Sequence, residues 1–212
     1  MGLPRWCKKS FGCHYEHGVQ VKNKSKKNGS SKHEYFWSWD DQQMHADGKG
    51  GNDLMEGSDF NDTLIGGDGY DHIDTQEGKK NKATGGKGKD WFFVDSEDLE
   101  DSHVTITDFN RKQKDKIAWD DDRSDYDFKI QYKKGDSIIM ARDDNDEPYS
   151  KVATVKGHKI DTKKDFIYDK DDHWHSSGDV RSMDSSGTKK SMRNIDPANT
   201  GELLSDILTS SI

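Results

Sequence analysis

Aspartate recurs every nine residues in the glycine-rich segment between Gly48 and Asp74. Each aspartate stands sixth in a nine-residue block, and an apolar residue follows two positions later. The aspartates are Asp53, Asp62 and Asp71, and the apolar residues are Met55, Leu64 and Ile73. A fixed period is typical of a stacked repeat, in which one block cannot bury its apolar side chain alone and packs on its neighbours.

The residue types in each block suit the binding of a hard cation. Glycine allows positive φ angles and close backbone approach, which a loop that curls around an ion requires. Carbonyl oxygens then face inward, and the carboxylate at the sixth position completes the ligand set. Calcium accepts about six to eight oxygen ligands of this kind, which favours calcium over magnesium or zinc. Each loop leads into a very short strand whose apolar residue points into the core.

Negative charge is concentrated in the same segment. Residues 47–74 carry eight acidic side chains and one lysine, a net charge of −7 (−8 + 1), and the whole chain carries −8. Carboxylates packed into tight turns repel one another without a counter-cation. A solvated acidic linker would also be rich in Gly, Asp and Asn, but it has no reason to keep an apolar residue at a fixed period.

Two blocks match the pattern G-G-x-G-x-D-x-U-x at every specified position: GGDGYDHID (Gly66–Asp74) and GGKGKDWFF (Gly85–Phe93). They resemble the nonapeptide of the RTX (hemolysin-type) calcium-binding repeat family. The resemblance covers residues 47–119 closely and 126–168 loosely. It implies a parallel β-roll in which two blocks form one turn, with calcium between a loop and the loop two blocks further on.

The resemblance implies one calcium ion between the loops that end at Asp53 and Asp71, and another between the loops that end at Asp71 and Asp90. The residues that it implies as calcium ligands or ligand-loop glycines are Gly48, Gly50, Asp53, Gly57, Asp59, Asp62, Gly66, Gly67, Asp68, Gly69, Asp71, Gly86, Gly88 and Asp90.

The block Thr75–Thr84 departs from the pattern. Lys80 stands at its aspartate position and Lys82 at its apolar position, and the block is one residue too long. A full-strength calcium site shared with Asp62 is therefore not expected.

Apolar segments after the fourth block predict the close of the roll. They are Trp91–Val94, Val104–Phe109 and Asp115–Trp119. Their order resembles the end of the β-roll in secreted bacterial RTX enzymes. Asp108 and Asp115 fit either calcium ligands at that edge or turn residues. From Tyr126 to Tyr168 apolar and polar residues alternate between turns, which indicates antiparallel hairpins.

The sequence thus predicts a mainly β fold: a short parallel β-roll of calcium-binding nonapeptide repeats followed by antiparallel β-hairpins, with flexible termini. The predicted division is a basic flexible segment at 1–46, the roll and its cap at 47–120, an antiparallel β segment at 121–170 and a flexible tail at 171–212. Only 29% of residues are hydrophobic and 35% are charged, too little apolar material for a conventional core throughout.

The N-terminal segment contains three features of its own. Asn23–Lys32 is a disordered linker by composition. Tyr35–Trp39 is an aromatic cluster that could cap the open end of the roll or stack on carbohydrate. Cys7 and Cys13 could form a small disulfide loop, but with the nearby histidines they fit no common zinc template, so we expect an incidental pair. Without regular aromatic interleaving, the basic tail is not expected to bind nucleic acid.

The C-terminal segment predicts recognition by another molecule. Asp171–His175 could ligate a metal through its two histidines, although an exposed loop is favoured. Gly201–Ile212 places four apolar residues on one face of a short helix, which is marginal alone in water. The resemblance implies a C-terminal signal for type I secretion machinery; packing of the helix onto the hairpins is the alternative. The N-terminus has no apolar signal region, and no apolar run approaches a membrane span.

Three function classes follow from these observations. The leading hypothesis is a secreted, extracellular, non-catalytic protein that folds on binding calcium. The second is a C-terminal module or remnant of an RTX hydrolase. A whole hydrolase is not expected, because the H-E-x-x-H and G-x-S-x-G signatures are absent from the sequence. The third is a calcium-rigidified surface component or adhesin that contacts polysaccharide or a cell surface.

Overall fold

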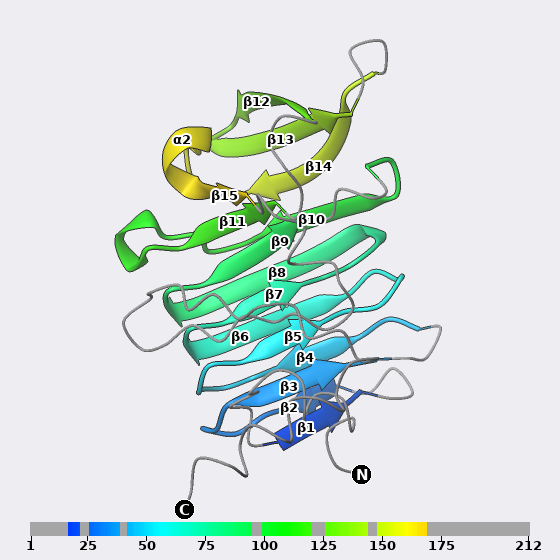
Figure 1. Cartoon of the computed structure of the whole chain (residues 1–212), viewed down its shortest axis with the longest axis vertical. Coiled ribbons are helices and arrows are strands. Elements are labelled where there is room, and N and C mark those ends of the chain that lie inside the picture. The colour runs from blue at the N-terminus through cyan, green and yellow to red at the C-terminus, as the bar shows by residue number, and fades with distance from the viewer. Residues whose placement is uncertain are drawn as a thin grey trace, which may run out of the picture.

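The computed structural model describes residues 17–21, 26–38, 42–94, 99–119, 126–143 and 148–168. Two sheets run along this part of the chain, and their strands lie one above the other in Figure 1. The seven-stranded sheet contains, in order, β1 (His17–Gln20), β3 (Glu34–Trp37), β5 (Leu54–Glu56), β7 (His72–Asp74), β9 (Trp91–Val94), β11 (Lys116–Trp119) and β15 (Phe166–Tyr168).

The eight-stranded sheet contains, in order, β12 (Asp127–Lys133), β13 (Asp136–Arg142), β14 (Ser150–Val155), β10 (Ser102–Ile106), β8 (Gly78–Gly88), β6 (Thr63–Gly69), β4 (His45–Asp47) and β2 (Lys26–Asn28). From β1 to β11 the chain passes from one sheet to the other at every step, and neighbouring strands pair in parallel. The fold is therefore a parallel β-solenoid. In the part of the chain that the structure describes, the helical segments are a 3-10 turn (Arg111–Gln113) and α2 (Thr162–Asp165).

Two nine-residue blocks form one turn of the solenoid, as predicted. Met55 pairs with Ile73 on the next turn of one sheet, and Leu64 pairs with Ala83 on the next turn of the other. The apolar position of each block points between the sheets, where these four side chains are at most 1% exposed. Because each block buries about one side chain, each contributes roughly 1–3 kcal/mol, and the core is stable only as a stack.

The core consists of two ladders of aligned apolar residues. One sheet supplies Phe36, Met55, Ile73, Phe92 and Ile117, and the other supplies Ala46, Leu64, Ala83, Ile106 and Val155. The first ladder consists of large side chains, whereas the second includes two alanines and a valine.

The solenoid begins earlier than the sequence predicted. The expected flexible segment 1–46 contains β1, β2, β3 and part of β4, and Lys26–Asn28, within the expected linker, is strand β2. The aromatic cluster is no end cap, because β3 lies between β1 and β5. Phe36 points into the core, whereas Tyr35 and Trp37 stack on each other at 5.0 Å in a separate apolar cluster.

The predicted hairpins are present, and they continue the solenoid. β12 pairs antiparallel with β13, and β13 with β14. β14 then pairs in parallel with β10, and β15 in parallel with β11, so both sheets run on into this segment (Figure 1). The antiparallel strands therefore cover the last turn of the roll, instead of forming a core of their own.

Several sequence predictions lie outside the described residues. They concern Cys7, Cys13, Trp39, Asp171–His175 and Gly201–Ile212. Across the described ranges, the longest helical element is a single turn, and none could cross a membrane.

Candidate metal centre

A column of carboxylates runs along the edge of the solenoid where the chain passes from the eight-stranded to the seven-stranded sheet. Asp53, Asp71 and Asp90 form its middle, and each is at most 1% exposed. The Oδ1 atom of each accepts a hydrogen bond from a backbone N–H one turn earlier. These bonds join Glu34 N to Asp53 (2.8 Å), Asp53 N to Asp71 (2.9 Å) and Asp71 N to Asp90 (3.1 Å). One half of each carboxylate thus fastens consecutive turns together.

The other half of each carboxylate has no partner. Oδ2 of Asp53, Asp71 and Asp90 is buried, and no donor among the described residues reaches it. An unsatisfied buried polar atom costs about 1–3 kcal/mol, and more when it is charged. Such atoms are rare in folded proteins, and an ion is one of their standard explanations.

Each unpartnered oxygen faces a glycine at the start of its own loop. The position of a Cβ added to Gly48 would lie 2.1 Å from Asp53 Oδ2 and 2.5 Å from the carbonyl oxygen of Gly66, one turn further on. The same test places the Cβ of Gly66 at 2.2 Å from Asp71 Oδ2. Carboxylate and carbonyl oxygens from neighbouring turns therefore converge beside Gly48, which only glycine can allow. This donor set is the one that calcium prefers.

The electrostatics of the column follow from its burial. Burial raises the pKa of Asp53 to about 8, partly offset by the N–H of Glu34 and reinforced by the Glu34 carboxylate. Burial and the neighbouring carboxylates likewise raise the pKa of Asp71 and of Asp90 to about 8. The site therefore resists three adjacent negative charges, and it is suited to a positive charge placed between them.

Hydrogen bonds satisfy the acids at the two ends of the column. At one end, Glu34 Oε2 accepts the N–H of Ser30 at 2.7 Å. At the other, Asp115 accepts the N–H of Asp90 at 3.1 Å and that of Asn110 at 2.7 Å. Asp108 accepts the two amides that open the fourth-block loop, at 2.9 and 2.8 Å. Of the two alternatives for Asp108 and Asp115, these contacts favour the turn role.

Sequence reasoning missed Glu34. The segment GSSKHEYFW (Gly29–Trp37) is a weak repeat, with glycine first, an acid sixth and Phe36 eighth. Its remaining positions lack the glycines of the pattern. A Cβ on Gly29 would meet Glu34 Oε2 at 2.4 Å and the Gly48 carbonyl at 2.4 Å, the same arrangement as at Gly48. The period and the acid at the sixth position were the available signals.

The remaining predicted residues of this edge line its loops or lie on its surface. Asp68 is exposed and pairs with Lys87 at 2.9 Å, so its carboxylate points away from the column. The other glycines join stacked loops through their backbones: Gly50 bridges to Asp68, Gly67 pairs with Gly86, and Gly69 pairs with Gly88.

The opposite edge of the solenoid is satisfied by protein donors. Asp62 is fully buried, and Asp59 of the same loop is exposed. Both oxygens of Asp62 accept hydrogen bonds, from the N–H of Met44 and from the N–H and hydroxyl of Ser58, at 2.5 to 3.1 Å. Burial, partly offset by these bonds, raises the pKa of Asp62 to about 6. Gly57 makes room for the Asp62 carboxylate, since its Cβ would lie 2.5 Å from Oδ2.

The assignment of Lys80 and Lys82 to the repeat positions is wrong. Asn81 takes the sixth position, since its Oδ1 accepts the N–H of Asp62 at 2.7 Å, and Ala83 takes the apolar position opposite Leu64. The additional residue of this block is accommodated in the loop before Asn81, which moves the register by one. Both lysines are therefore exposed.

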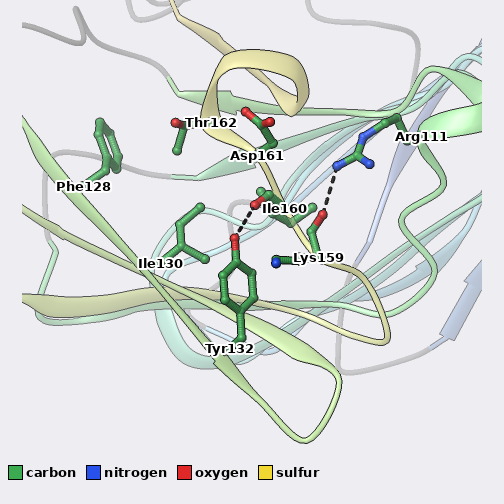
Figure 2. Close-up of a pocket in the computed structure, with 8 residues that line it drawn as sticks. All are labelled: Arg111, Phe128, Ile130, Tyr132, Lys159, Ile160, Asp161 and Thr162. Carbon is green, nitrogen blue, oxygen red and sulfur yellow. Dashed lines mark hydrogen bonds between the residues drawn. The ribbon is translucent and has the colours of Figure 1, made fainter.

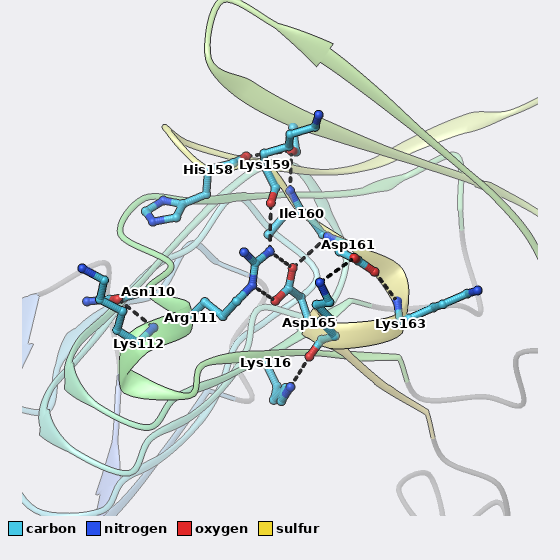
Figure 3. Close-up of polar contacts among 12 residues, drawn as sticks. Asn110, Arg111, Lys112, Lys116, His158, Lys159, Ile160, Asp161, Lys163 and Asp165 are labelled. Atoms are coloured by element: carbon cyan, nitrogen blue, oxygen red, sulfur yellow. Dashed lines mark hydrogen bonds and ion pairs between the residues drawn. The ribbon is translucent and has the colours of Figure 1, made fainter.

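A hollow of about 530 Å³ lies at the far end of the molecule, between β12 and the segment that leads into α2 (Figure 2). Its polar groups are engaged with the protein itself. The Tyr132 hydroxyl donates to the Ile160 carbonyl at 2.8 Å, and Arg111 donates to the Lys159 carbonyl at 2.9 Å. Figure 3 shows that Arg111 also pairs with the buried carboxylate of Asp165. The hollow therefore lies where the antiparallel strands pack against the last loops of the roll.

Searches against family models, curated proteins and solved structures find no match to this chain. Within the described ranges, no three side chains of the types His, Cys, Asp or Glu gather as a metal cluster. Each loop contributes one buried carboxylate instead, so carbonyl oxygens would have to supply most ligands. That composition fits calcium, and it does not fit the nitrogen and sulfur sets of zinc.

Proposed function

We propose that the chain is an RTX-type calcium-binding protein whose β-roll takes up calcium along one edge. The observation that carries the proposal is the row of three buried carboxylate oxygens, on Asp53, Asp71 and Asp90, that no described donor reaches. The two matching nonapeptides and the parallel solenoid support the same proposal.

The three loops lie on successive turns, so their carboxylates form two neighbouring pairs. Asp53 and Asp71 would hold one ion and Asp71 and Asp90 a second, with carbonyl oxygens such as that of Gly66 completing the sets. Bound calcium supplies positive charge at the point where the carboxylates repel one another. The hydrogen-bonded ends, Glu34 and Asp115, would not need an ion.

Calcium binding would be coupled to folding. Without the ion, the folded state must either protonate these carboxyls or accept unpaired buried charges, and both reduce its stability. A ligand that binds only the folded state stabilises it in proportion to the logarithm of its concentration. Extracellular calcium modules typically bind with dissociation constants of about 10⁻⁴–10⁻³ M. The chain would therefore be only marginally stable, and in part unfolded, at the calcium concentration inside a cell, and it would fold fully after secretion.

The test is calcium titration by calorimetry, with far-UV circular dichroism recorded in parallel. We expect about two ions to bind at millimolar calcium, with a gain of β-structure that a chelator reverses. Magnesium at the same concentration is the control, because its demand for octahedral geometry fits such a loop poorly. Absence of binding at millimolar calcium, or binding with an unchanged spectrum, would overturn the proposal.

A further inference from the structure

Asn81 lies on the edge of the solenoid opposite Asp53, Asp71 and Asp90, which form the proposed calcium edge. It stands at the position where the loops of the calcium edge have aspartate. Its Oδ1 accepts the N–H of Asp62, one turn earlier, at 2.7 Å. Asp71 Oδ1 accepts the N–H of Asp53 in the same way at 2.9 Å. Asn81 is also as deeply buried as the aspartates, at 1% exposure. Its side chain therefore keeps the half of the aspartate's role that joins consecutive turns.

The other half of the Asn81 side chain does what an aspartate cannot do. Its Nδ2 donates to three carbonyl oxygens of its own loop, those of Glu77 (2.7 Å), Gln76 (3.2 Å) and Thr75 (3.3 Å). In Asp71 the atom at the equivalent place is the unpartnered Oδ2. Carbonyl oxygens that converge on a carboxylate need a cation between them, because a carboxylate only accepts hydrogen bonds. An amide nitrogen needs no cation, because its own N–H groups donate to the carbonyl oxygens.

The second acid of this edge is satisfied by a similar device. Ser58 gives Asp62 both a backbone N–H and a hydroxyl donor, at 2.5 and 3.0 Å, from within the same loop. This hydroxyl, which also lies 3.0 Å from the carbonyl oxygen of Gln42, is present because the residue after Gly57 is serine. In the matching blocks that position is Gly67 or Gly86. In two successive loops of this edge, those of Asp62 and Asn81, protein N–H and O–H donors therefore occupy the place that a cation would take.

We infer that calcium binds along one edge of the roll only, and that the Asn81 amide takes the place of a cation on the other. The inference rests on the proposed function and adds to it an assignment of the two edges. The edge with Asp62 and Asn81 is then stabilised by hydrogen bonds at any calcium concentration. The edge with Asp53, Asp71 and Asp90 is stabilised when calcium binds.

Exchange of asparagine and aspartate between the two edges tests this assignment. Asn81→Asp should convert its loop to a calcium-dependent one, because a carboxylate would then face three carbonyl oxygens. We expect its melting temperature in chelator to fall by roughly 3–10 °C, since the buried hydrogen bonds of the Asn81 amide to its loop carbonyls are lost. Calcium should reverse this fall, and titration should detect one ion more than in the unmodified chain.

Asp90→Asn is the reciprocal variant. It should lose one of the two ions and melt above the unmodified chain in chelator, because a neutral amide replaces a buried carboxylate whose Oδ2 has no described donor. A lower melting temperature of Asp90→Asn in chelator would contradict the inference, and this variant remains informative if Asn81→Asp does not fold.

Two results separate the failure of this inference from that of the proposed function. If the unmodified chain binds two ions but Asn81→Asp gains none and melts lower with and without calcium, the edge assignment alone is wrong. If the unmodified chain binds no calcium, the proposed function fails and the assignment fails with it.

Discussion

Asp71 is the residue on which the calcium edge depends most. Its Oδ1 holds the N–H of Asp53, its own N–H is held by Asp90, and its Oδ2 lies in the middle of the three unpartnered oxygens. A single residue thus joins three turns, and its carboxylate faces both proposed ion sites. Its neighbour Asp68, three residues earlier, has none of these contacts.

Asp71→Ala is expected to abolish binding of both ions. In chelator it should also lower the free energy of unfolding by about 1–3 kcal/mol, because the buried N–H of Asp53 loses its acceptor. Calorimetric titration and urea unfolding measure the two effects. Asp68→Ala is the matched control, since it removes the same charge from the same loop; it should keep both ions and cost about 0–1 kcal/mol, as a surface ion pair does. Equal loss of binding in both variants would mean that only net charge matters.

The raised pKa values give the calcium-free roll a defined pH dependence. Between pH 3.8 and about 8, folded Asp53, Asp71 and Asp90 hold protons that the unfolded chain has released. Their stabilisation is therefore complete at low pH and is lost as pH rises through about 8. The buried His72 and His103, with pKa lowered by desolvation to about 4, act in the opposite sense only below pH 6.5.

Unfolding in chelator should therefore require less urea at pH 8.0 than at pH 6.5. Calcium should remove most of this difference, and its binding at pH 7 should release protons, measurable by calorimetry in two buffers of different ionisation enthalpy. Stability that rises from pH 6.5 to 8.0 without calcium would show that the carboxyls are not protonated in the folded state.

At the scale of the elements, the stacked loops of the calcium edge touch through their backbones. Gly86 has φ +105°, and a Cβ there would lie 2.0 Å from the carbonyl oxygen of Gly67 on the preceding turn. Gly135, in the turn between β12 and β13, has φ +89° but nothing within 4 Å of its Cβ position. The two glycines share a backbone conformation and differ in what surrounds them.

Gly86→Ala and Gly135→Ala should therefore differ in cost. At Gly135, alanine costs about 1–2 kcal/mol for the left-handed conformation alone. At Gly86 the same cost is joined by a backbone clash that separates two loops, so we expect a larger loss of stability and weaker calcium binding. Thermal unfolding with and without calcium measures both. Similar costs at the two sites would show that the loops need not approach so closely.

At the scale of the whole molecule, one ion pair ties the last loops of the solenoid together. Arg111, in the 3-10 turn before β11, donates through Nε to the fully buried Asp165 at 2.6 Å. Burial raises the pKa of Asp165, but the hydrogen bonds from Arg111 and from the Asp161 N–H outweigh it and leave the pKa below its usual range. The antiparallel strands are thus fastened to the roll through a charged contact.

Arg111→Ala is expected to lower stability by about 2–3 kcal/mol, because it leaves a buried carboxylate with one remaining donor. Arg111→Lys should recover part of this loss, since it keeps the charge but not the paired geometry. Urea unfolding in saturating calcium is the measurement, so that the calcium sites stay filled. Full recovery by lysine would mean that charge alone holds the contact.

The sequence predicted the solenoid and the middle of its carboxylate column because both depend on a local period. Asp53 and Ile73 could be placed by counting nine. Glu34 and Asn81 could not. Glu34 belongs to a block that keeps only its first glycine, and Asn81 follows an inserted residue that only the hydrogen-bond register reveals. The parallel pairing of β14 with β10 joins distant segments, which periodicity does not report.

The satisfied acids at Glu34 and Asp115 give the carboxylate column a start and a stop. Between them every turn adds one unpartnered oxygen, so under the proposed function the number of calcium sites would rise by one with each added turn. Duplication of a single turn would lengthen the molecule and add one ion without changing either end. If calcium binds as proposed, one repeating unit would set both the length of the roll and the number of ions that it holds.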